Sequence, residues 1–212
     1  MQLVMPFAKT TSYAQALALI EQWPDWAYSI ALVHGPQGCG KTHLAYTFAA
    51  RARATFIAPE RIGTRPADQL LTGNHAWVID GIEAVTDAPA LAQLINHARA
   101  RGDYVLLTAS TPAAELPFTL PDLRSRLLAL PAVALGAPDD ALLMGVLAKQ
   151  FADRQLRIAP EVLQFATSHI ERSYAAAQGF VKAMDGLSLL RGRAITLALV
   201  REGLKNPSWQ NG

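Results

Sequence analysis

The chain of 212 residues is long enough to bury one substantial core, or the core of a large domain together with that of a smaller one. Hydrophobic residues make up 51% and charged residues 17%, which is the composition of an ordered globular protein and excludes a disordered one. The formal net charge of +2 is close to neutral, so charge alone gives no argument for a nucleic-acid surface.

The only cysteine, Cys39, excludes an internal disulfide, and the sequence holds no closely spaced Cys or Cys/His set for a structural zinc site. The first ten residues lack the basic start and the long apolar run of a signal peptide, and Pro6 interrupts them. No later apolar run is long enough to span a bilayer. We therefore expect a cytoplasmic protein that makes no membrane contact.

In the first two thirds of the chain, segments with helix and strand character alternate. Ser12 and Gln15 have the spacing of a capping box, which predicts a helix from Ser12 towards Trp23. Further helices are expected at residues 43–51 and 87–102. Short apolar runs predict buried strands at residues 28–33, 54–58, 76–79, 104–108 and 132–135. This alternation predicts an α/β fold with a parallel sheet covered by helices on both faces.

Beyond Gly136 the pattern changes to helices alone. They are expected at residues 139–151, 161–170, 174–187 and 197–204. Asp139, Ser173 and Thr196 are residue types that cap helix starts, and Pro160 suits a first helical turn. The boundary between an α/β core and a small helical lid is therefore expected near residues 136–138.

The segment GPQGCGKT lies directly after the first apolar strand and before a helix. Gly35, Gly40, Lys41 and Thr42 fit the pattern G-x-x-x-x-G-K-[ST]. Its glycines turn N–H groups towards phosphate oxygens, its lysine neutralises the β- and γ-phosphates, and its threonine hydroxyl coordinates Mg²⁺. A chance match in a loop is the alternative, against which the strand-loop-helix context argues. We expect ATP or ADP with Mg²⁺ to be bound by Gly35, Pro36, Gln37, Gly38, Cys39, Gly40, Lys41, Thr42 and His43.

Cys39 lies inside this glycine-rich segment. We interpret it as a small residue tolerated between two glycines. A redox switch is the alternative, but such a switch needs a lowered thiol pKa, and nothing in the sequence indicates one.

A second buried strand, within the segment WVIDGIE, ends at Asp80. In P-loop proteins an aspartate at this place holds the magnesium ion, so Asp80 is the expected metal-binding and catalytic carboxylate. An ordinary strand that ends in a solvated aspartate is the alternative. Many P-loop proteins of the AAA+ class carry a water-activating glutamate directly after this aspartate, and here Gly81 takes its place. Glu83 is interpreted as the start of a helix, and slow intrinsic hydrolysis is expected.

Two further segments carry polar residues of the expected site. Thr108 and Ser110, at the end of the strand YVLLT, are candidates for sensing the γ-phosphate, and simple strand-end capping is the alternative. The segment DLRSRL contains Arg124 and Arg126. Of these, Arg126 is the better candidate for a catalytic arginine finger that reaches the nucleotide of a neighbouring protein. Two arginines on a solvated helix face are the alternative.

Taken together, GPQGCGKTHLA, WVIDGIE, VLLTAS, DLRSRL and the helical tail resemble the DnaA family of replication initiators over about residues 12–204. The resemblance implies an AAA+ P-loop NTPase core and a small all-helical C-terminal lid. Initiators also carry a C-terminal helix-turn-helix domain, for which the sequence leaves no room after the lid. The expected group within the family is therefore the Hda type, which stimulates hydrolysis of DnaA-bound ATP and so prevents re-initiation of chromosome replication.

In that group a short N-terminal peptide docks on the DNA polymerase III sliding clamp, the beta subunit. Gln2, Leu3, Met5 and Phe7 match its pattern, and Pro6 favours an extended conformation. A strand folded onto the core is the alternative. The resemblance therefore implies a clamp-binding peptide at 1–8, a core at 9–136 and a lid at 137–212. The implied partners are DnaA and the clamp, with DNA reached only through the clamp, and a homo-oligomer is left open.

One position departs from the family pattern. DnaA relatives place a nucleotide-sensing arginine in the lid where this chain has Ala176, although Arg172 lies one turn earlier. This departure leaves open both lid closure driven by nucleotide and discrimination between ATP and ADP. The resemblance implies that the ADP-bound form is the active one. A helicase loader resembling DnaC or IstB is the alternative function. A small-molecule kinase is a third interpretation, against which the helical tail argues.

Overall fold

The computed structural model describes residues 11–205 of the chain. It divides them into two compact units, one of residues 11–136 and one that begins at Ala137. The candidate clamp-binding residues Gln2, Leu3, Met5 and Phe7 lie outside the described residues. Each unit is described on its own below.

The first unit is built on one parallel sheet of five strands. They are β1 (Ile30–His34), β2 (Thr55–Phe56), β3 (Ala76–Ile79), β4 (Tyr104–Ala109) and β5 (Ala132–Ala134), in the spatial order β2-β3-β4-β1-β5. Parallel pairing places the end of β1 beside the end of β4, with Val33 opposite Thr108. The predicted parallel α/β fold is therefore confirmed. The edge strand β2 has only two residues, shorter than expected, because its residues are partly exposed and pair on one side only.

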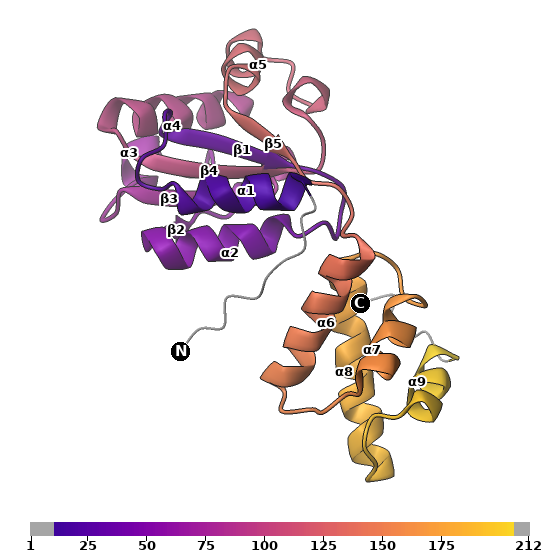
Figure 1. Cartoon of the computed structure of the whole chain (residues 1–212). Helices are drawn as coiled ribbons and strands as arrows, with labels where there is room; N and C mark the ends of the chain where they lie inside the picture. The colour runs from indigo at the N-terminus through magenta and orange to yellow at the C-terminus, as the bar shows by residue number, and fades with distance from the viewer. Residues whose placement is uncertain (1–10, 206–212) are drawn as a thin grey trace. The chain divides into compact units, whose positions relative to one another are not determined.

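Helices cover both faces of this sheet (Figure 1). α1 (Thr11–Glu21) and α2 (Lys41–Ala52) pack on one face, while α3 (Ala67–Leu70) and α4 (Ala88–Arg101) pack on the other. α5 (Pro121–Leu128) follows beside α4. Because α1 already begins at Thr11, Ser12 is not its N-cap as expected. The Ser12 hydroxyl instead accepts a hydrogen bond of 3.3 Å from the N–H of Gly136.

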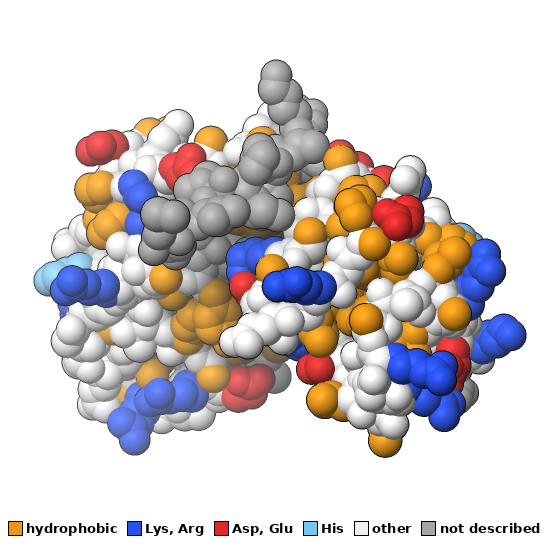
Figure 2. Space-filling model, turned by 60° about the horizontal axis from the view of Figure 1, so that its bottom comes forward, with side chains coloured by type: hydrophobic (Ala, Val, Ile, Leu, Met, Phe, Trp, Pro, Cys, Tyr) orange, Lys and Arg blue, Asp and Glu red, His pale blue; other side chains and the backbone are white. Residues whose placement is uncertain are grey.

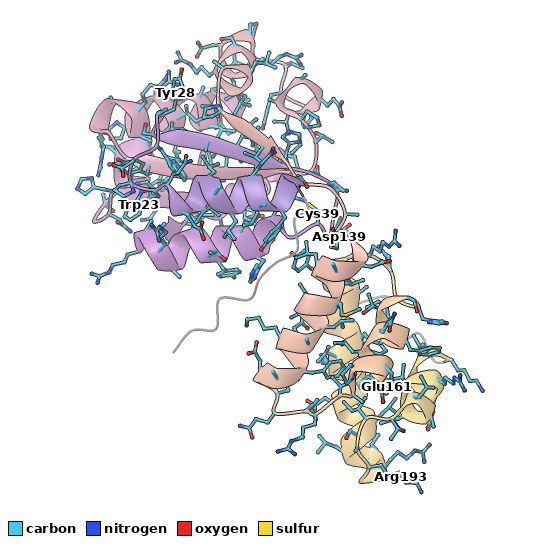
Figure 3. All side chains as sticks on the ribbon, viewed as in Figure 1. Trp23, Tyr28, Cys39, Asp139, Glu161 and Arg193 are labelled. Carbon is cyan, nitrogen blue, oxygen red and sulfur yellow. The ribbon has the colours of Figure 1, made fainter. Side chains whose placement is uncertain are left out.

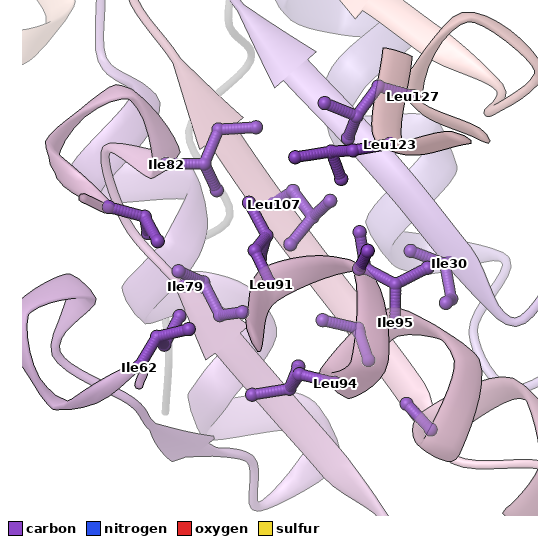
Figure 4. Close-up of a cluster of buried hydrophobic side chains, with 14 of the residues drawn as sticks. Ile30, Ile62, Ile79, Ile82, Leu91, Leu94, Ile95, Leu107, Leu123 and Leu127 are labelled. Carbon is purple, nitrogen blue, oxygen red and sulfur yellow. The ribbon is translucent and has the colours of Figure 1, made fainter. Parts of the chain in front are cut away.

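The core follows from the alternation of side chains along the strands. In β1, Ile30 and Leu32 belong to the cluster under α4 and α5, and Ala31 and Val33 are buried on the opposite face. Figure 4 shows Leu91, Leu94 and Ile95 of α4 packed against strand residues such as Ile79 and Leu107. Both faces of the central strands are therefore buried, which holds their carboxyl ends in fixed positions.

A buried carboxylate ties the amino ends of β3 and β4 together. Asp103 is fully buried, and its carboxylate accepts a hydrogen bond of 3.0 Å from Trp77 Nε1. Its other contacts are with His75 Nδ1 at 2.9 Å and with Arg101 Nε at 3.1 Å. These contacts stabilise the sheet at the amino ends of its strands.

Aromatic rings cover the start of the first unit where α1 leads into β1. Trp26 stacks on Phe48 of α2 with ring centroids 5.0 Å apart. Trp23 meets the edges of Phe48 and Tyr104 at centroid distances of 6.4 and 5.8 Å. The two tryptophans thereby pack the segment between α1 and β1 against α2 and the start of β4.

Between residues 137 and 205 the second unit contains four helices. They are α6 (Asp140–Asp153), α7 (Pro160–Thr167), α8 (Tyr174–Arg191) and α9 (Leu197–Leu204). The predicted caps are confirmed, because the side chains of Asp139, Ser173 and Thr196 each accept a backbone N–H at a helix start. Pro160 begins α7 as expected, but that helix ends at Thr167 rather than near residue 170.

Short 3-10 helices were missed by the sequence patterns. They lie at Pro59–Arg61, Ile82–Ala84 and Ala113–Glu115, and three residues are too few to show a helical period. In the part of the chain that the structure covers, none of the helices combines the length and apolar character needed to cross a bilayer.

Candidate functional site

The loop between β1 and α2 has a backbone that depends on glycine. Gly38 and Gly40 adopt positive φ angles of 76° and 102°, which residues with a Cβ rarely adopt. Gly35 is needed for a different reason, since a Cβ at this position would lie 2.2 Å from the carbonyl oxygen of Leu135. The loop is therefore fixed against the segment that follows β5, and it leads directly into the first turn of α2.

Lys41 is the first residue of α2, and its side chain folds back over the loop. Its Nζ donates hydrogen bonds to the carbonyl oxygens of Gly35 at 2.7 Å and Pro36 at 2.9 Å. No side chain caps the helix start, where Gly40 is the N-cap. The positive end of the helix dipole and a lysine ammonium thus lie at the same loop, an arrangement that favours an anion.

Three side chains from three different elements meet at the carboxyl ends of the strands. Thr42 Oγ1 of α2 donates a hydrogen bond of 2.8 Å to Asp80 Oδ2, directly after β3. The other oxygen of Asp80 accepts a short hydrogen bond from the hydroxyl of Thr108 in β4. Thr108 in turn accepts the N–H of Gly81 at 2.8 Å. The structure therefore brings together Thr42, Asp80 and Thr108, which are far apart in the sequence.

Ser110 and Glu83 form a second link between the same two strand ends. The carboxylate of Glu83 accepts a hydrogen bond of 3.0 Å from the backbone N–H of Ser110. From the sequence, Glu83 was interpreted only as the start of a helix, and it does lie in the 3-10 helix Ile82–Ala84. Its contact with Ser110 was missed, and its position three residues after Asp80 was the only available signal.

The remaining loop residues differ in exposure. Pro36, Gln37 and His43 are exposed, whereas Cys39, labelled in Figure 3, is buried. Burial raises the pKa of the Cys39 thiol, although the nearby Lys41 opposes this effect. The small-residue interpretation of Cys39 agrees with a buried thiol that is held in its neutral form. Burial also lowers the pKa of His34, which immediately precedes the loop, while Glu115 acts in the opposite direction.

The two arginines of α5 have different surroundings. Arg124 donates to the carbonyl oxygens of Phe118 and Ala114 at 3.2 and 3.5 Å, so it holds the preceding loop. Arg126 forms an ion pair of 2.9 Å with Asp122 one turn earlier, and this hydrogen bond raises the pKa of Arg126. Among the contacts recorded for the described residues, neither arginine reaches Thr42, Asp80 or Thr108.

In the helical unit, the position matched to a sensing arginine is buried. Ala176 is 6% exposed, and its N–H donates to the Ser173 hydroxyl that caps α8. Arg172 lies just before this cap, and its guanidinium pairs with both carboxylate oxygens of Asp140 at 2.8 and 3.1 Å. Arg172 is therefore engaged within its own unit.

Charge on the molecular surface agrees with the near-neutral composition. On the face drawn in Figure 2, basic and acidic side chains are interspersed rather than gathered in a basic stripe. Within residues 11–205, no group of three or more His, Cys, Asp or Glu residues is arranged as a self-sufficient metal site. Any cation held by Thr42 and Asp80 would need further ligands from a bound molecule.

Comparisons with known proteins identify similar chains, although no family model matches. The chromosomal replication initiator protein DnaA of Magnetococcus marinus is 24% identical, and the match covers 90% of this chain and 48% of that protein. The chain thus spans about half the length of this curated relative. Domain III of the Thermotoga maritima replication initiation protein DnaA has a TM-score of 0.77 at 18% identity and covers 97% and 94% of the two chains.

Two further solved structures have the same fold. AMPPCP-bound DnaA from Aquifex aeolicus has a TM-score of 0.71 at 14% identity, covering 99% of this chain and 71% of that one. The Thermotoga maritima RuvB Holliday junction branch migration motor has a TM-score of 0.74 at 16% identity, covering 94% and 69%. The chain therefore has the fold of these AAA+ P-loop domains, and its sequence is similar to that of DnaA.

Proposed function

We propose that the first unit binds ADP or ATP at the loop Gly35–Thr42. The observation that carries this proposal is the Thr42–Asp80–Thr108 network beside the glycine-rich loop. A P-loop threonine and an aspartate at a strand end together hold Mg²⁺ in nucleotide-binding proteins. AMPPCP bound to the similar DnaA of Aquifex aeolicus supports a nucleotide as the ligand.

The residues present fit Mg²⁺. Thr42 Oγ1 and Asp80 Oδ2 lie 2.8 Å apart and are both oxygen ligands, the type that Mg²⁺ prefers. Mg²⁺ uses few protein ligands and completes its shell with phosphate and water, so two side chains suffice. When bound, the ion neutralises phosphate charge. The chain's own contribution is to orient these oxygens, and Lys41 would exchange its carbonyl contacts for phosphate oxygens.

The test of nucleotide binding is a titration of fluorescent ADP against Lys41→Ala. A charged hydrogen bond contributes about 1.5–3 kcal/mol, so affinity should fall by roughly 10- to 100-fold. Lys149→Ala is the matched control, because Lys149 forms only an exposed pair with Asp153 in the other unit. Equal affinities of wild type and Lys41→Ala for ADP would contradict this proposal.

We further propose that the nucleotide-bound chain acts on another protein rather than as an efficient ATPase. In this function it docks on the sliding clamp and stimulates hydrolysis of DnaA-bound ATP, which prevents re-initiation of replication. The relation to DnaA supports this proposal. A further support is Gly81, which offers no side chain where a water-activating glutamate is usual. ADP is the proposed nucleotide of the active form.

Arg126 is the proposed arginine finger. Arg124 donates to backbone carbonyl oxygens, whereas the contact found for Arg126 among the described residues is the ion pair with Asp122 one helix turn away, in which the two side chains are 29% and 52% exposed. Pairs of this kind contribute little, so Arg126 can exchange Asp122 for a phosphate group at low cost. A guanidinium supplied by a neighbour stabilises the transferring phosphoryl group and can raise the rate by about 10³- to 10⁵-fold.

The assay follows conversion of DnaA-bound ATP to ADP in the presence of clamp loaded on DNA. Arg126→Ala should bind ADP and clamp normally but fail to stimulate hydrolysis. Arg126→Lys keeps the positive charge but lacks the planar guanidinium, so it should restore little of the stimulation of ATP hydrolysis. Equal stimulation by wild type and Arg126→Ala would contradict the assigned role. No stimulation by wild type would favour the helicase-loader function instead.

The clamp-docking proposal rests on the pattern of Gln2, Leu3, Met5 and Phe7. An extended peptide needs only its anchor side chains, so Leu3→Ala should abolish co-elution with the clamp and leave ADP binding unchanged. A synthetic peptide of residues 1–8 should compete with the full chain. If deletion of these residues leaves clamp affinity unchanged, the match to the pattern is accidental.

A further inference from the structure

The turn after Asp80 brings a carboxylate back to the site. Gly81 adopts a positive φ of 78°, and its N–H is held by the Thr108 hydroxyl. The chain then enters the 3-10 helix Ile82–Ala84, in which Ile82 is fully buried. Anchored in this way, Glu83 points to the end of β4, where Oε1 accepts the N–H of Ser110 at 3.0 Å.

The second oxygen of this carboxylate is buried and lacks a partner. Among the described residues, Glu83 Oε2 is one of four buried side-chain atoms for which no hydrogen bond is found. Buried acceptors in native proteins almost always have a donor, which is often an ordered water molecule. Glu83 Oε2 therefore fits as an acceptor for a water molecule at this place.

The position of Glu83 relative to the proposed phosphate site follows from its bonds. Ser110 is two residues beyond Thr108, a chain distance of at most about 7 Å. Thr108 contacts Asp80, which faces the hydroxyl of Thr42. The unpartnered oxygen of Glu83 therefore lies near the carboxyl ends of β3 and β4, where the terminal phosphate of a bound ATP would lie.

We propose that Glu83 is the catalytic residue of a slow ATP hydrolysis by this chain. The inference rests on the proposed nucleotide binding. A water molecule held by Glu83 Oε2 attacks the γ-phosphorus, and its proton passes to this oxygen. The bond between the γ-phosphorus and the β–γ bridging oxygen breaks, leaving ADP and inorganic phosphate. Glu83 then returns the proton to solvent.

The assignment explains how hydrolysis can occur although Gly81 has no side chain. Glu83 is two residues further along than the usual position, and its Oε1 is committed to Ser110. Only one carboxylate oxygen is therefore available to the water. This constraint agrees with slow turnover, because the carboxylate cannot turn to follow the water as the reaction proceeds.

The experiment compares Glu83→Gln with wild type by single-turnover hydrolysis of ATP, by fluorescent ADP titration and by thermal unfolding. Glutamine keeps an acceptor for the Ser110 N–H but cannot accept the proton. The rate should fall by about 100-fold or more, the typical contribution of a positioned base. ADP affinity should stay within about threefold. Glu60→Gln, at an exposed position of the 3-10 helix Pro59–Arg61, is the control and should match wild type.

The pH profile separates a base from a structural contact. Wild type and Glu83→Gln should differ in the pH dependence of hydrolysis, because only the wild type has a carboxylate that can accept the proton of the attacking water. An unchanged rate in Glu83→Gln would overturn the assignment, as would a parallel loss of ADP affinity, which would indicate a structural role. Failure of wild type itself to bind ADP would instead overturn the proposed nucleotide binding.

Discussion

At the scale of single residues, Thr108 of β4 connects the carboxyl ends of β3 and β4. It is fully buried, donates to Asp80 and accepts from the N–H of Gly81. Thr108→Val has nearly the same shape but leaves both partners unsatisfied, so it should lower the free energy of unfolding by about 1–3 kcal/mol. Thr108→Ser, which keeps the hydroxyl, is the matched control. A urea denaturation midpoint equal to that of wild type would show that water satisfies these groups.

Cys39 provides a second test at this scale. Burial raises the pKa of its thiol, so the reactive thiolate appears only at higher pH than in an exposed cysteine. Reaction with a disulfide reagent should be much slower in the folded protein at pH 7.5 than in urea. The folded rate should also keep rising above pH 9, where an ordinary thiol is already largely ionised. Rapid labelling of the folded protein at neutral pH would favour the redox interpretation.

How far the site could be predicted differs from residue to residue. Gly35, Lys41 and Thr42 were predicted because their spacing within eight residues is itself the signal. Asp80 and Thr108 were predicted because each lies at the end of an apolar strand, where P-loop proteins place a metal-binding aspartate and a polar sensor. The contact of Glu83 with Ser110 was not predicted, because it depends on the turn that Gly81 makes and on the buried Ile82.

At the scale of elements, two glycines should respond to alanine in opposite ways. A Cβ at Gly35 would lie 2.2 Å from the backbone oxygen of Leu135, so Gly35→Ala forces β1 and the segment after β5 apart. We expect it to cost more than about 2 kcal/mol of stability. Gly145 lies within α6 with nothing near its Cβ position, so Gly145→Ala should stabilise that helix by about 0.5–1 kcal/mol. Thermal melts of both variants test this pair, and a destabilised Gly145→Ala would contradict it.

Elements were predicted best where local signals mark their ends. The four helices of the second unit were found because side chains such as Asp139 and Ser173 cap them. The end of α7 was misplaced, since Ile170 is buried in the turn beyond the helix and extends the apolar pattern. The order of strands could not be derived from periodicity, because it is set by packing between segments distant in the chain.

At the scale of the whole molecule, bound nucleotide should stabilise the first unit by an amount that grows with the logarithm of its concentration above Kd. Ligand at 100 times its Kd contributes about 2.7 kcal/mol to the free energy of unfolding. Wild type at this ADP concentration should therefore melt several degrees higher than without it, whereas the shift of Lys41→Ala at the same concentration should be clearly smaller. An equal shift in both proteins would mean that ADP stabilises the chain elsewhere.

The placement of tryptophan makes the two units distinguishable by spectroscopy. Trp23, Trp26 and Trp77 all lie in the first unit, and residues 137–205 contain none. In a Trp209→Phe background, which removes the remaining indole outside the described residues, emission reports on the sheet and its aromatic neighbours alone. Far-ultraviolet circular dichroism reports on both units. If the units melt independently, the two signals should therefore have different midpoints. Coincident curves would indicate that the protein unfolds as one cooperative body.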